Sequence, residues 1–199
     1  MQLTTEFYEM EIIDGLFPHM QKGGIYELPL AGSAELPKLE RLSAGEVGIL
    51  NCLEIPTYET ICRVNLTMQL GIEYLMYGDC GFIFSVRADG IEMHLEKGEL
   101  VKGAFCFTVD GLTVCDMGNY YIPKFYYRWR LDKIERLTMV QERPDVMETV
   151  TISEIDTTEE DCNEENIDHL TLTLLDPIPK VRIGDNTLIT SKEFLSRLN

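Results

Sequence analysis

From Gly45 onward, short stretches of apolar and β-branched residues alternate with Gly, Pro and Asp along the chain. Stretches of this length and composition are typical of β-strands rather than helices. We therefore expect a mainly β protein of the α+β kind, with an antiparallel sheet that is either sandwich-like or curled. The expected strands are 46–53, 60–68, 71–77, 120–131, 134–140, 147–155 and 168–175.

Two Asp-Gly pairs, at 89–90 and 110–111, predict tight hairpins, because this dipeptide accepts the positive φ angles of a type I′ turn. Each pair is flanked by alternating apolar and polar residues, which supports the register. The expected cross-strand pairs include Phe84 with Leu95 in the first hairpin and Cys106 with Cys115 in the second.

The sequence patterns at the two ends of the chain differ from the strand pattern of the middle. Gly and Pro interrupt residues 1–44 repeatedly, which predicts an irregular N-terminal segment. Pro177 and Pro179 are expected to end the last strand. Thr190 and Glu193 form a capping box, which predicts a short C-terminal helix. We interpret 1–199 as one domain: the N-terminal segment, a β-rich core over 45–155, an acidic loop over 156–166, and a final strand and helix over 167–199.

Several classes of site lack sequence support. The chain contains no GxGxxG or P-loop pattern and no C-x-x-C pair, so no cofactor or metal is predicted. Its three histidines, at 19, 94 and 169, stand in no recognisable catalytic frame, which favours a binding protein over an enzyme. No apolar run could span a bilayer and no basic leader precedes one, so we expect a soluble cytoplasmic protein.

The net charge of −17 is unevenly distributed. Residues 144–179 carry 11 acids and no Lys or Arg, whereas 120–143 carry 3 acids and 6 bases. The acids of the densest part are Glu154, Asp156, Glu159, Glu160, Asp161, Glu164, Glu165 and Asp168. Three interpretations fit them: a flexible, solvated acidic connection, an electrostatic docking surface for a basic protein, or a calcium loop. The calcium interpretation lacks the ligand spacing and the central glycine of an EF-hand.

A second candidate site lies on the expected strand 120–131. Lys124, Tyr126, Arg128 and Arg130 fall on one face of that strand and could form an anion or ligand pocket. The surrounding negative charge would repel a polyanion, so no nucleic-acid partner is expected.

The leading hypothesis is an acidic interaction protein that binds and neutralises a basic protein partner, as an inhibitor or immunity-like protein does. A β-rich small-molecule binder or enzyme is the first alternative, with a pocket lined by groups such as Tyr127, Arg128, His94 or Cys106. A structural subunit of a phage or another assembly is the second. The sequence leaves the oligomeric state open.

Overall fold

The computed structural model describes residues 1–7, 18–34, 38–70, 73–89, 95–110, 123–140, 149–158, 166–183 and 187–190. These residues form one sheet of thirteen strands and contain no α-helix, so the mainly β prediction is confirmed. The strands are β1 (Gln2–Phe7), β2 (Ile25–Leu28), β3 (Leu30–Ser33), β4 (Glu40–Leu42), β5 (Gly48–Glu54), β6 (Thr57–Leu70), β7 (Glu73–Asp79), β8 (Ile83–Asp89), β9 (Leu100–Val109), β10 (Pro123–Val140), β11 (Thr149–Ile155), β12 (Asn166–Ile183) and β13 (Thr187–Thr190).

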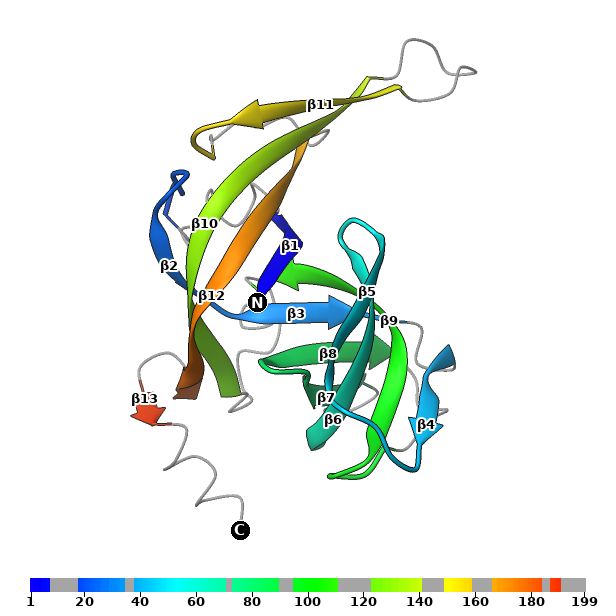
Figure 1. The fold of residues 1–199 in the computed structure, drawn as a ribbon. Coiled ribbons are helices and arrows are strands. Elements are labelled where there is room, and N and C mark those ends of the chain that lie inside the picture. Colours follow the sequence, from blue (N-terminus) through cyan, green and yellow to red (C-terminus); the bar gives the residue numbers. More distant parts are fainter. Residues whose placement is uncertain are drawn as a thin grey trace.

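Five of these strands close into a small barrel in the order β3-β8-β7-β6-β9 (Figure 1). Closure depends on β9, which pairs with β3 at Val109↔Leu30 and with β6 at Cys106↔Thr57. The curled form of the predicted sheet is therefore the one adopted. From the barrel the sheet continues through β1 to the long strands β12 and β10, and it ends at β11.

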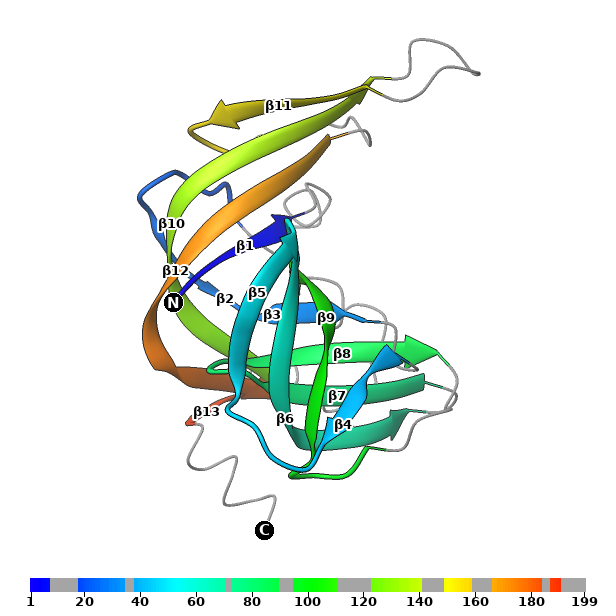
Figure 2. The ribbon, with the colours of Figure 1, turned by 45° about the vertical axis from the view of Figure 1, so that its right-hand side comes forward.

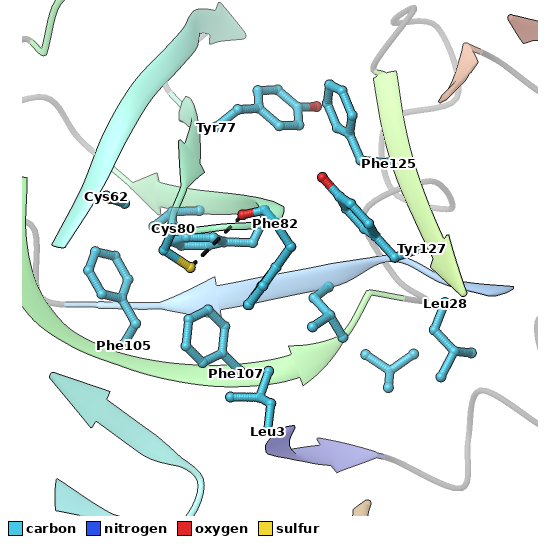
Figure 3. Close-up of a cluster of buried hydrophobic side chains, with 14 of the residues drawn as sticks. Leu3, Leu28, Cys62, Tyr77, Cys80, Phe82, Phe105, Phe107, Phe125 and Tyr127 are labelled. Atoms are coloured by element: carbon cyan, nitrogen blue, oxygen red, sulfur yellow. Dashed lines mark hydrogen bonds between the residues drawn. The ribbon is translucent and has the colours of Figure 1, made fainter. Parts of the chain in front are cut away.

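Aromatic rings fill the barrel and pack against rings of β10 (Figure 3). The Phe84 ring lies edge-on to Phe107 at 5.0 Å, and Phe82 lies edge-on to Trp129 of β10 at 5.6 Å, measured between ring centroids. The Tyr127 hydroxyl accepts a hydrogen bond from the Ile83 amide at 2.7 Å. Burial of such large rings is among the strongest contributions to folding, so the position of β10 is firmly set.

The pair of Phe84 with Leu95, expected at the first Asp-Gly turn, is wrong. Phe84 pairs with Gly78 of β7, while Leu95 lies outside any strand and exchanges two hydrogen bonds with the Tyr74 hydroxyl. Cys106 has a strand neighbour on each side, Ser33 of β3 and Thr57 of β6. Cys115 and residues 90–94 lie outside the described residues.

The N-terminal segment is more regular than expected. It supplies β1 to β4, and β1 lies inside the sheet between β12 and β9, with Leu3 and Phe7 buried. Gly and Pro separate these short strands without abolishing them, because their partners come from distant parts of the chain. One of these pairs joins Leu3 to Leu172.

Both predictions for the C-terminal part need correction. Strand β12 continues past Pro177 and Pro179 because the register with β10 shifts there, between Arg128↔Asp176 and Tyr126↔Lys180. Proline is tolerated at such a bulge, where no ladder hydrogen bond needs its missing N–H. Thr190, the predicted helix cap, is the last residue of β13, so the helix is not supported. Residues 191–199 lie outside the described residues.

Candidate interaction surface

A three-stranded arm lies at the far end of β10 from the barrel, with β11 as its outermost strand (Figures 1 and 2). We define the arm as residues 134–140 of β10, strand β11, and residues 166–170 of β12. On β10 and β12 the residues of the two faces differ in burial, whereas residues 150–154 of β11 are exposed on both faces. Ile134 and Leu170 are completely buried on the inner face, whereas Ile152 on the outer face is 65% exposed.

The centre of the outer face is apolar. Leu137 lies opposite Ile152 of β11 on one side and Ile167 of β12 on the other. Val150 lies two residues from Ile152 and is 49% exposed. Solvent-exposed side chains of this size grouped on neighbouring strands commonly mark an interaction site. This feature was not among the predicted sites, although the β-branched sequence of the 147–155 strand contains it.

Charged side chains surround that apolar centre. Glu154 forms an ion pair with Lys22, and the hydrogen bond from Lys22 lowers the pKa of the Glu154 carboxyl. Glu135 accepts a hydrogen bond from Lys133 at 2.6 Å. Burial lowers the pKa of His169 because it penalises the charged imidazolium, and nearby carboxylates only partly oppose this effect.

Asp168 does not belong to the exposed acidic surface predicted from the sequence. Its carboxylate is completely buried and accepts two hydrogen bonds from Arg136, at 3.0 Å from Nε and 3.2 Å from Nη2. Such a bidentate pair satisfies the charge of both groups inside the protein. Asp168 is thus part of the arm's interior and not available to a partner.

The beginning of the predicted acidic loop is tied to the N-terminal segment. Thr158 is completely buried. Its amide donates a hydrogen bond to the Met20 backbone oxygen at 2.9 Å, and its hydroxyl accepts one from the Met20 amide at 2.8 Å. Asp156 is exposed while its backbone oxygen accepts a hydrogen bond from the Lys22 amide at 2.9 Å. Of the solvated loop expected over 156–166, Asp156 is therefore exposed, whereas Thr158 is buried. The remaining acids of the prediction, Glu159, Glu160, Asp161, Glu164 and Glu165, lie outside the described residues.

The predicted anion pocket is not assembled as one site. Lys124 is buried, and its ammonium donates to the Asp110 backbone oxygen at 3.0 Å and lies 3.8 Å from that residue's carboxylate. Arg130 pairs with Asp132 at 2.6 Å. Tyr126 is covered by the Arg182 guanidinium, 4.5 Å above its ring. Arg128 is exposed. Two of the three predicted cations are thus held by carboxylates.

The residues suggested for a small-ligand pocket do not converge either. Tyr127 is buried with its hydroxyl bonded to the barrel backbone, whereas Arg128 is exposed on the opposite face of β10. Cys106 is half-buried on β9, and burial raises the pKa of its thiol. His94 lies outside the described residues. In the described part of the chain, no three His, Cys, Asp or Glu side chains are grouped to hold a metal ion.

The chain matches no protein-family model, no curated protein and no solved structure. Across the described ranges, no helix has the length and apolar character needed to cross a membrane.

Proposed function

We propose that this protein binds a basic protein partner through the outer face of the arm and neutralises the partner's charge. One observation carries the proposal: Val150 and Ile152 are about half or more exposed on the outermost strand of the sheet, within the most acidic part of the sequence. An apolar centre with a charged rim is the usual composition of a protein interface.

The charge around β11 selects the class of partner. The segments joined to its two ends, 141–148 and 156–165, carry nine acids and one base, Arg143. Because they are attached directly to β11, their negative field acts on any molecule that approaches this strand. Such a field accelerates association with a basic protein and repels an acidic one. A second copy of this chain, with a net charge of −17, is therefore disfavoured as the partner.

A comparison of two charge variants tests the proposal. The first changes Glu159, Glu160, Glu164 and Glu165 to Gln, and the control changes Glu40, Glu46, Glu54 and Glu96, four exposed acids outside the arm, to Gln. Both variants remove four negative charges and change the net charge from −17 to −13. A partner captured by the wild type should associate at least about tenfold more slowly with the first variant at low salt, and nearly normally with the control.

A third variant separates the apolar contribution from the charge. Replacing Val150 and Ile152 by Ser should leave the association rate nearly unchanged and raise the dissociation rate about tenfold or more, because short-range contacts act mainly on dissociation. Equal effects of the two charge variants, together with no effect of the Ser variant, would contradict a binding site on the arm.

A further inference from the structure

In the described part of the chain, one edge of β11 has no neighbouring strand. It lies at one end of the sheet order and pairs only with β10, from Ile155↔Ile134 to Thr149↔Val140. In an antiparallel ladder, alternate residues direct their N–H and C=O groups away from the neighbouring strand. Among the described residues, no strand pairs with that outward edge. Just beyond it, Gln21 bridges Thr157, which closes the edge after Ile155.

The two ends of the sheet differ in regularity. The pairing of β5, the strand at the other end, is broken by two register shifts, between Ile49 and Asn51 and between Cys52 and Glu54. The register of β11 has none. Irregular edges resist the addition of a further strand, whereas a straight, regular edge accepts one. Only β11 of these two therefore offers a continuous template.

The sequence of β11 also lacks the features that usually protect an edge. It reads Thr149-Val150-Thr151-Ile152-Ser153-Glu154-Ile155, without Lys, Pro or Gly and with a single charge. Five of its seven residues are β-branched, which favours extended backbone. Residues 150–154 are all exposed, and of these Glu154 forms an ion pair with Lys22.

From these features we propose that the partner contributes an extended segment that adds to the free edge of β11 as an additional strand. This inference rests on the proposed function and specifies its geometry. Main-chain hydrogen bonds would supply affinity, while alternate side chains contact Val150 and Ile152. Basic residues in the added segment would be attracted by exposed Asp156, just after β11, and by the net charge of −17, which favours an extended basic segment over a second acidic copy as the occupant.

The test uses a synthetic peptide of alternating lysine and valine, eight residues long, with the same peptide methylated at every backbone nitrogen as the control. Both peptides carry the same charge, but the methylated one has no backbone N–H to donate and its methyl groups hinder close approach of the strand, so only the first can form a complete ladder of main-chain hydrogen bonds. Amide hydrogen exchange of the full chain is measured by NMR at low ionic strength. The unmethylated peptide should slow exchange of alternate amides in 149–155 at least tenfold and leave the amides of β5 unchanged.

Other outcomes would overturn strand addition in distinguishable ways. If both peptides bind equally and exchange in β11 is unchanged, the basic-partner function stands and strand addition is wrong. If neither peptide binds, both proposals are contradicted. If, without peptide, the β11 amides exchange more slowly as the protein concentration rises, the occupant is a second copy of this chain. That result would overturn the proposal of a basic segment.

A proline variant provides an independent check on the same edge. Of the neighbouring substitutions Thr151→Pro and Ile152→Pro, one removes an outward N–H and the other removes an N–H that faces β10. The variant that keeps the wild-type thermal unfolding midpoint should bind the unmethylated peptide at least tenfold more weakly. Undiminished binding by that variant would overturn the proposal.

Discussion

At the scale of single residues, two carboxylates of one acidic run, Glu154 and Asp168, have opposite roles. Glu154 is exposed beside Lys22, whereas Asp168 is completely buried against Arg136. Local sequence does not distinguish them, because the burial of Asp168 follows from pairing across strands: Asp168 lies opposite Arg136 of β10 and Phe7 of β1. The same limit applies to Lys124, whose neutralising carboxylate, Asp110, directly follows the end of β9.

The buried pair gives a direct prediction at this scale. Asp168→Asn should destabilise the fold by about 3–5 kcal/mol, because it leaves the Arg136 charge buried without its partner. Asp156→Asn removes the same charge from an exposed position and should change the free energy of unfolding by no more than about 0.5 kcal/mol. Urea unfolding at pH 7 measures both.

A double variant separates the cost of a lone buried charge from a general loss of packing. Arg136→Met combined with Asp168→Leu should recover much of the lost stability, since it leaves no unpaired charge. Equal, small losses for Asp168→Asn and Asp156→Asn would show that the pair is not buried as described.

At the scale of elements, strand positions in the middle of the chain were predictable, and their partners were not. The expected strands at 60–68 and 71–77 correspond to β6 and β7, because alternation and β-branched content are local properties. The partners of β9 are β1, β3, β4 and β6, four segments spread over the first half of the sequence. Tight hairpins of the described residues form elsewhere: one joins β5 to β6 at Glu54↔Thr57, and another joins β7 to β8 through Gly81, which adopts φ +104°, a conformation that favours glycine.

The closed barrel sets a steric limit on its own strands. A Cβ at Gly78 would lie 2.9 Å from both the Cys62 sulfur and the Phe84 ring, which face the barrel interior. Gly78→Ala should therefore destabilise the protein by about 1–3 kcal/mol through overpacking. Gly45→Ala is the control, because its added Cβ would meet nothing nearer than 3.6 Å. Its effect should be within about 1 kcal/mol.

Thermal and urea unfolding of both variants measure these effects. Adding Cys62→Ala to Gly78→Ala removes one of the two close contacts and should restore part of the lost stability. The barrel interpretation would be contradicted if Gly78→Ala were as stable as the Gly45 control.

At the scale of the whole molecule, net charge was the most informative quantity in the sequence, and it describes partners better than it describes fold. It indicates which molecules are attracted and which are repelled, but not where contact occurs. The location on the arm depends on the exposure of Val150 and Ile152 and on the sheet ending at β11. The exposure of these two side chains and the end position of β11 both follow from the complete topology. The alternation of apolar and polar residues along the sequence does not determine that topology.

The same charge should make the stability of the fold depend on salt. Folding brings 34 acids and 17 bases into a compact volume, so the excess negative charge repels itself more in the folded chain than in the expanded unfolded chain. Raising ionic strength from about 0.01 M to about 0.15 M shortens the Debye length from about 30 Å to about 8 Å and screens this repulsion. The urea midpoint should therefore rise with added sodium chloride.

The two four-Gln variants used for binding also test the origin of this effect. Each removes four negative charges, so the salt-induced rise of the urea midpoint should be smaller in each variant than in the wild type. The two reductions should be similar. Repulsion between acids adjacent in sequence persists in the unfolded chain and therefore contributes little to the difference. A midpoint that falls with salt would mean that attractive ion pairs such as Lys22 with Glu154, rather than excess charge, dominate the electrostatics of this fold.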